Sequence, residues 1–174
     1  DDVESRGLGD VYKRQVLMIP RKGAEVAEIT EKNMRDVLEV RKALEELAVQ
    51  LACDKITKEE IEEMKKAAED FKKILKSKDI TEIAEADVRF HDIIYMATDN
   101  QKLIQLLNNL REQMYRYRVE YLKREEAHPQ LIAEHAAIIE YISKGEKKAA
   151  TDIMCKHIDN QVTTVIDVIR TKQN

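Results

Sequence analysis

Apolar residues recur at intervals of three and four along most of the chain, the spacing of helices that bury one face. This pattern predicts six helices, over about residues 30–53, 57–77, 79–98, 100–124, 129–144 and 146–170. Typical start and stop signals stand at their ends: Thr30 or Asn33, the capping box Thr57-Lys58-Glu59-Glu60, Asp79, Asn100, Pro129 and Gly145. Long helices joined by short loops predict an all-α fold, an antiparallel bundle of six or seven helices.

The stretch before the first helix has a different character. Residues 1–15 lack periodicity, and the string SRGLGDVYKRQ resembles translated sequencing-adapter read-through, so we expect a non-native or disordered segment there. In residues 16–29 an apolar run, a turn sequence with Arg21 and Lys22, and an alternating stretch predict a short β-hairpin. A flexible arm fits equally well, because a two-stranded hairpin is only marginally stable alone. Residues 30–174 form the predicted helical domain.

The composition agrees with a single helical domain. The chain has 174 residues, enough for one core, and its four glycines, two prolines and 37% charged residues favour helices over sheets. The net charge of the chain is −4, so it does not have the excess of basic residues that is typical of a nucleic-acid-binding domain. Two cysteines are too few for a disulfide framework, and no apolar run approaches the ~20 residues of a membrane span. We therefore expect a cytoplasmic protein that does not bind membranes.

Two polar residues interrupt the apolar stripe of the third predicted helix. Asp87 and His91 are four residues apart, so their side chains lie one turn apart on the same face. That face also carries Ile83, Phe90 and Ile94. A carboxylate and an imidazole inside a core destabilise the fold unless something satisfies them.

Two further histidines also fall on inner faces. His135 is flanked at helical spacing by Leu131 and Ile139 in the fifth predicted helix, and His157 follows Ile153 by four residues in the sixth. A single histidine in a core is usually hydrogen-bonded rather than bound to a metal. Hydrogen bonding of each histidine separately explains less well why three of them lie on the inner faces of three helices.

Asp87, His91, His135 and His157 are thus candidate ligands of one metal ion. Three imidazoles and one carboxylate suit Zn²⁺, with Ni²⁺ and Fe²⁺ as alternatives. The spacing of Asp87 and His91 makes them a local pair. That the other two histidines meet them is inferred from the packing of a bundle.

Arg41 lies in the apolar stripe of the first predicted helix, close to Leu38 and Leu44. An arginine in such a position either extends to the edge of the stripe or faces an anion in the interior. The pattern leaves both possibilities open.

These motifs resemble the FCD domain, the C-terminal ligand-binding domain of FadR-subfamily GntR transcription regulators. The resemblance rests on the helix VLEVRKALEELAVQLAC, the DVRFH motif, Glu134-His135 and a histidine 22 residues after His135, and it covers about residues 30–170. It implies that Asp87, His91, His135 and His157 bind a divalent metal.

The resemblance also implies partners. Arg41 would contact the carboxylate of a small carboxylate or sugar-acid effector, with Arg89 as a second contact. Residues 16–29 would be the remnant of a wing and linker, with Arg21 and Lys22 near DNA phosphates, and most of the winged helix-turn-helix would be missing. The protein would be a homodimer that binds DNA through that missing domain.

The sequence therefore predicts the effector-sensing domain of a bacterial DNA-binding transcription regulator, and not an enzyme. A metal-dependent hydrolase or isomerase on a helical-bundle scaffold is the alternative, because a metal-bound water can act as a nucleophile. Against it, we expect no general base, since the inner faces show no further Glu or Asp beside the predicted ligands. A purely structural module with hydrogen-bonded core histidines is a third interpretation.

Overall fold

Six α-helices and one short 3-10 helix make up most of the computed structural model, which describes residues 16–19, 23–26, 30–77 and 79–173. The elements are β1 (Val16–Ile19), β2 (Gly23–Val26), α2 (Glu31–Lys55), α3 (Lys58–Ile74), α4 (Ile80–Ala97), α5 (Gln101–Leu122), η1 (Glu125–Ala127), α6 (His128–Ser143) and α7 (Lys147–Gln173). The predicted all-α class is confirmed, and each predicted helix has its counterpart. Within these residues, no helix combines the length and the apolar character that a membrane span requires.

The helices begin where the sequence places capping side chains. The side-chain oxygens that accept hydrogen bonds from the first backbone N–H groups belong to Thr30, Thr57, Asp79 and Asn100. At the end of α6, Gly145 adopts a left-handed backbone with φ 68°, and the N–H of Glu146 donates to the carbonyl of Tyr141. This hydrogen bond closes the helix, and the left-handed backbone explains why a glycine stands there.

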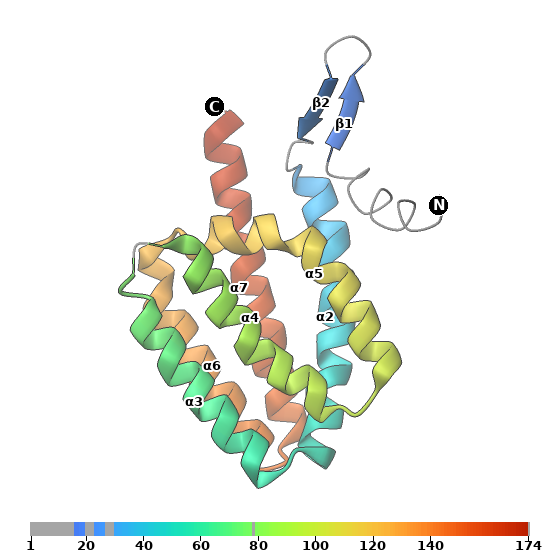
Figure 1. Cartoon of the computed structure of the whole chain (residues 1–174), viewed down its shortest axis with the longest axis vertical. Coiled ribbons are helices and arrows are strands. Elements are labelled where there is room, and N and C mark those ends of the chain that lie inside the picture. Colours follow the sequence, from blue (N-terminus) through green and yellow to red (C-terminus); the bar gives the residue numbers. More distant parts are fainter. Residues whose placement is uncertain (1–15, 20–22, 27–29, 78, 174) are drawn as a thin grey trace, which may run out of the picture.

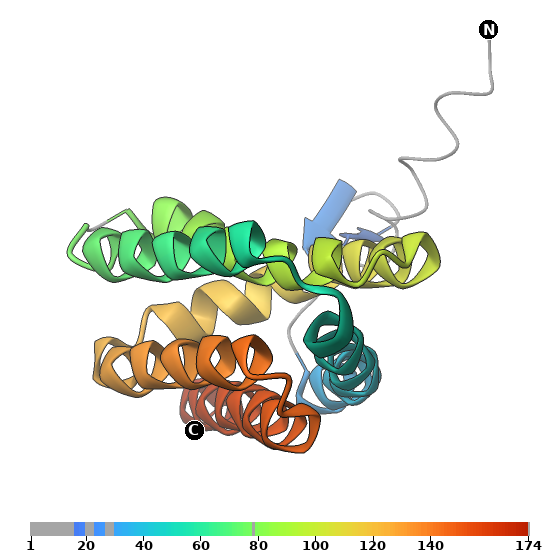
Figure 2. The same cartoon turned by 90° about the horizontal axis from the view of Figure 1, so that it is seen from below.

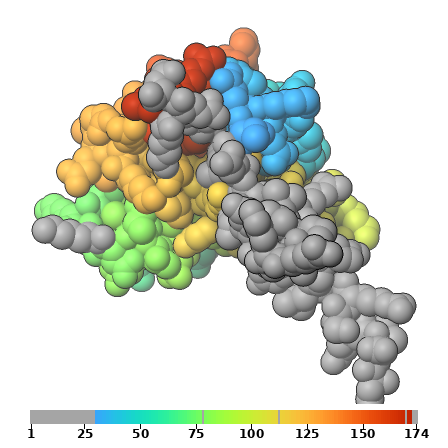
Figure 3. All heavy atoms as spheres, turned by 90° about the horizontal axis from the view of Figure 1, so that it is seen from above, coloured from blue at the N-terminus to red at the C-terminus, as the bar shows by residue number. Residues whose placement is uncertain are grey.

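The helices pack in two layers. Helices α3 and α4 lie side by side on one face, α6 and α7 lie on the other, and α2 runs along one edge (Figures 1 and 2). Helix α2 packs mainly against α7, and α5 packs against both α4 and α2. The start of α2 and the end of α7 are neighbours in Figure 3, and Arg170 of α7 forms an ion pair with Glu31 of α2 at 3.1 Å. The six helices thus share one hydrophobic core.

The core contains apolar residues from all six helices, and its buried Phe and Tyr residues come from α3, α4 and α5. Its largest fully buried apolar side chains include Phe71 of α3, Phe90 and Ile94 of α4, Leu131 of α6 and Met154 of α7. Several polar and charged side chains are buried in the same core, among them Asp87, His91, His135 and His157.

The two strands precede the bundle. Val16–Ile19 and Gly23–Val26 pair antiparallel, with Val16 opposite Val26. Residues 1–15, Arg21 and Lys22 lie outside the described residues, and so do the predictions made for them.

Candidate metal centre

Three histidines from three helices meet in the middle of the bundle. His91 of α4, His135 of α6 and His157 of α7 offer ring nitrogens that all lie within 4.8 Å of one another. All three side chains are buried, none more than 1% exposed. Nitrogens at this spacing, on helices that hold them rigidly, could bind a single metal ion together.

Asp87 lies beside this cluster, one turn before His91. Its Oδ1 atom is 3.3 Å from Nε2 of His135, and its Oδ2 atom is 3.0 Å from Nε of Arg118. Burial works to raise the pKa of Asp87, but the charge of Arg118 and the neighbouring histidines hold that pKa well below its usual range. Asp87 is therefore a carboxylate in the core, next to the histidine cluster.

Aromatic rings position the imidazole of His135. It stacks on Phe90 with ring centroids 4.0 Å apart and an interplanar angle of 19°, and Phe71 approaches it at 5.1 Å. Packing on two sides leaves the ring little rotational freedom. The same contacts account for its burial without a hydrogen bond.

Many buried polar atoms in this centre lack a hydrogen-bond partner. Among the described residues they are Nη2 of Arg41, Oε2 of Glu45, both carboxylate oxygens of Asp87, Nε of Arg118 and both ring nitrogens of His91 and of His135. Two of these atoms, Oδ2 of Asp87 and Nε of Arg118, still form an ion pair at 3.0 Å, whereas a buried atom left without any partner costs about 1–3 kcal/mol. A divalent cation would take up lone pairs of the imidazoles and of the carboxylate, so the donor set fits a metal.

The imidazoles of His91 and His135 are in the protonation state that a metal needs. Burial lowers the pKa of His91 to about 4, although the nearby Glu45 acts to raise it. Burial likewise lowers the pKa of His135, against the opposing effect of Asp87. Both rings are therefore neutral near pH 7, with lone pairs available for coordination.

His157 is oriented by Glu134. The Nδ1 atom of His157 lies 2.9 Å from Oε2 of Glu134, whose other oxygen accepts hydrogen bonds from Gln130 and Asn160. Burial works to raise the pKa of Glu134, but the hydrogen bonds from His157, Gln130 and Asn160 lower it overall. A carboxylate on the far nitrogen of a histidine is a common support for a metal ligand.

Arg41 points into the interior, so its side chain does not extend to the edge of the apolar stripe. Only 2% of it is exposed, and its Nε donates to Oε1 of Glu45 at 2.8 Å. The hydroxyl of Tyr95 donates to the same oxygen at 2.6 Å. Burial acts to raise the pKa of Glu45, but the charge of Arg41 and the hydrogen bond from Tyr95 lower it well below its usual range. Arg41 and Glu45 thus form a buried ion pair next to the histidines.

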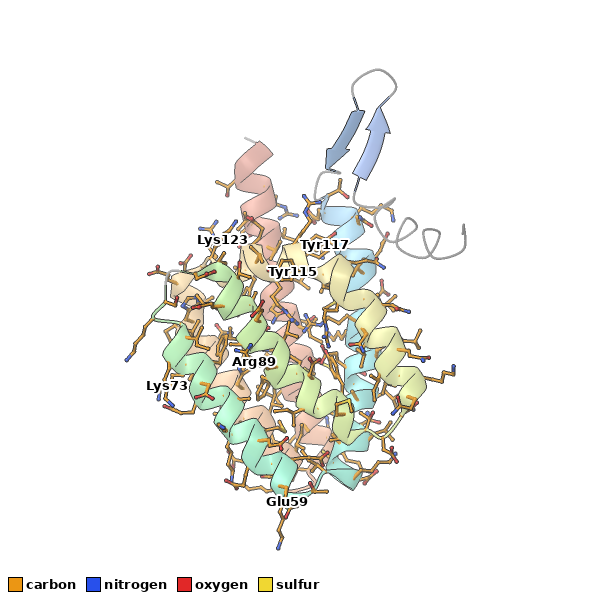
Figure 4. All side chains as sticks on the ribbon, in the orientation of Figure 1. Glu59, Lys73, Arg89, Tyr115, Tyr117 and Lys123 are labelled. Carbon is orange, nitrogen blue, oxygen red and sulfur yellow. The ribbon has the colours of Figure 1, made fainter. Side chains whose placement is uncertain are left out.

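Arg89 does not join this centre. Because it follows Asp87 by two positions, its side chain lies on the opposite side of α4, at the surface and beside α3 (Figure 4). It is 56% exposed and pairs with Glu85 at 4.0 Å. The second buried arginine is instead Arg118 of α5, whose direction the sequence pattern did not settle.

Two buried glutamates correct the expectation that no further carboxylate lies near the histidines. Glu45 is fully buried and its Oε2 atom is 3.5 Å from Nδ1 of His91, and Glu134 contacts His157. A signal for Glu45 does exist in the sequence, because the buried positions of α2 follow helical spacing: 34, 38, 41, 45, 48 and 52. Glu134 had no such signal beyond its place next to His135.

Comparison with known proteins places these features in a family context. The FCD domain profile matches residues 36–160. Over 141 residues the chain is 26% identical to an uncharacterized HTH-type transcriptional regulator, YdhC, of Bacillus subtilis strain 168. That alignment covers 80% of this chain and 63% of the relative, so the chain spans less than two thirds of that protein.

Solved structures share the fold. The E. coli protein McbR/YncC superposes with a TM-score of 0.82 at 16% identity, covering 95% of this chain and 83% of that one. A GntR-family transcriptional regulator from Pseudomonas syringae pv. tomato gives a TM-score of 0.64 at 18% identity, covering 97% and 69%. At these identities the likeness extends to the fold alone.

Proposed function

Since the chain belongs to the FCD domain family of GntR-type transcription regulators, we propose that it senses a small organic acid through a bound divalent metal. The observation that carries the metal part is the convergence of three buried imidazoles with nitrogens within 4.8 Å of one another, two of which, His91 and His135, have no hydrogen-bond partner for either ring nitrogen. His91, His135 and His157 would hold the ion, with Asp87 as a further ligand. Zn²⁺ is the first choice for this donor set, and Ni²⁺ or Fe²⁺ are alternatives.

Electrostatics supports an anionic effector next to the metal. The centre contains two buried arginines, Arg41 and Arg118. It also contains three buried carboxylates, those of Glu45, Asp87 and Glu134. The cluster therefore has a net charge of −1, and a divalent ion would change it to +1. A buried net positive charge favours an anion, and Arg41 has an unpartnered N–H with which to bind a carboxylate.

Effector binding would regulate DNA binding by changing the conformation of the helical bundle. A GntR-type regulator acts on DNA as a dimer with a separate DNA-binding domain, and we extend this arrangement to this protein. In this proposal residues 16–29 are part of a wing and linker, with Arg21 and Lys22 near DNA phosphates. A shift between two states of the helical domain would change the spacing of the DNA-binding domains.

An enzymatic role is the weaker candidate. Glu45 and Glu134 do lie beside the histidines, as a hydrolase or isomerase would require of a general base. However, each accepts hydrogen bonds from fixed partners, and the pKa of each is lowered. A carboxylate with a lowered pKa is a poor base near neutral pH, which supports a sensing role.

Metal analysis of matched variants tests the proposal. Protein purified without chelator is expected to bind about one Zn²⁺ per chain, and His135→Ala to lose it. His128→Ala is the control, because His128 contacts the carbonyl of Leu122 at the start of α6, outside the cluster. Equal metal content and affinity in the wild type and His135→Ala, with both folded by circular dichroism, would refute the metal site.

A further inference from the structure

One glutamine connects the histidine cluster to Arg41. Gln161 of α7 follows His157 by one helical turn and is only 5% exposed. Its Nε2 atom lies 2.9 Å from Nε2 of His157, and its Oε1 atom accepts a hydrogen bond from Nη1 of Arg41 at 2.7 Å. Both ends of one amide are therefore engaged, one by a candidate metal ligand and the other by the candidate anion-binding arginine.

The chemistry of the partners determines how this bridge is oriented. An arginine nitrogen only donates, so the atom facing Arg41 must be the carbonyl oxygen of Gln161. The amide N–H group then faces Nε2 of His157, which must accept with its lone pair. The proton of that imidazole is consequently on Nδ1, where it is donated to Glu134. One directed chain of hydrogen bonds runs from Arg41 through Gln161 and His157 to Glu134.

A metal ion cannot share this arrangement. The lone pair on Nε2 of His157 is the one that a metal would take, since Nδ1 is committed to Glu134. Metal binding there must displace the N–H group of Gln161. Because an amide is rigid and planar, moving its nitrogen also moves its oxygen away from Arg41. Arg41 would then have two terminal nitrogens, Nη1 and the already unpartnered Nη2, in need of an acceptor.

We propose that Gln161 couples the two binding events, so that metal binding at His157 frees Arg41 for a carboxylate. This rests on the proposed function, because it assumes a metal at the histidines and an anion at Arg41. A carboxylate presents two oxygens to the two freed terminal nitrogens of the guanidinium, which suits a bidentate contact. The net charge of the metal-bound cluster, +1, further selects a singly charged acid. Without the metal, Gln161 occupies Nη1 of Arg41, and the net negative charge of the cluster disfavours anions.

Titration with Zn²⁺ in the presence and absence of acetate tests this coupling. In the wild type, saturating acetate is expected to raise the Zn²⁺ affinity by about tenfold, in the range usual for coupled sites. In Gln161→Leu, the Zn²⁺ affinity without acetate is expected to increase several-fold, since no N–H group must be displaced. The effect of acetate on the variant is expected to fall to about twofold, because Arg41 is no longer released by the metal.

A second glutamine provides the matched control. Gln50 of α2 donates to Thr151 of α7 at 3.4 Å at the surface rather than bridging His157 and Arg41, so Gln50→Leu should retain the tenfold effect of acetate. Gln161→Ala repeats the measurement with a smaller side chain, and circular dichroism checks that each variant is helical.

The outcomes separate this inference from the function on which it rests. If the wild type binds no Zn²⁺, the proposed function and the coupling both fail. If it binds Zn²⁺ but acetate leaves the affinity unchanged, or if both Gln161 variants retain the full acetate effect, the coupling alone is overturned.

Discussion

Replacing Asp87 by alanine is expected to lower the free energy of unfolding of the metal-free protein by about 3–5 kcal/mol. Asp87 is paired with Arg118 at 3.0 Å, and their side chains are only 1% and 5% exposed. The substitution would leave the guanidinium in the core without a counter-charge. Removing one partner of a buried pair is far more costly than the net contribution of the pair itself, because the remaining charge is neither solvated nor neutralised.

Urea unfolding of chelator-treated protein, followed by circular dichroism, measures this loss. The control is Asp36→Ala, which removes a carboxylate from the pair with Lys32 at 2.6 Å on the surface of α2. Because Lys32 and Asp36 are 84% and 58% exposed, that change should cost less than about 1 kcal/mol. Adding Arg118→Met to Asp87→Ala should recover most of the lost stability, since it removes the unpaired charge.

The reasoning would be wrong if Asp87→Ala cost no more than Asp36→Ala. It would also be wrong if Arg118→Met failed to rescue Asp87→Ala, because the loss would then not come from a buried guanidinium. In either case Asp87 would not be held as a charged group by Arg118.

Three further predictions concern pH, the surface arginine and the end of α6. The metal-free protein should lose about 3 kcal/mol of stability through His91 as the pH falls from 6.5 to 4. The pKa of His91 is about 4 in the folded protein and 6.5 in the unfolded chain, so the unfolded chain binds the proton first and acid favours unfolding. Urea unfolding over this pH range that shows no loss of stability would contradict this prediction. Arg89→Ala should leave stability within about 0.5 kcal/mol and the acetate effect on Zn²⁺ binding unchanged, whereas Arg41→Gln should abolish that effect in the same titration. Gly145→Ala should destabilise the protein by about 1–2 kcal/mol in urea, because alanine disfavours the left-handed φ of 68°, and an unchanged midpoint would count against that backbone geometry.

The local features of this protein were predictable from its sequence. Helix starts depend on a few adjacent residues, so Thr57 with Glu60 and Asp79 could be identified as caps directly. Helical spacing likewise placed His91 and His135 on inner faces, since burial of one face repeats every three or four residues. These are properties that the chain carries within one or two turns.

Contacts between helices were decided only by the tertiary structure. Spacing shows which face of a helix is buried, but not which residue of another helix stands opposite, since that depends on the rotation and shift of each pair. The buried partner of Asp87 is therefore Arg118 on α5, and Glu134 was found next to His157 only in the fold. The hydrogen bond between Arg41 and Gln161 joins residues 120 positions apart, so no local pattern could reveal it. The sequence by itself determined the helices and the residue types that they bury, and the packing of the bundle determined how those residues form one centre.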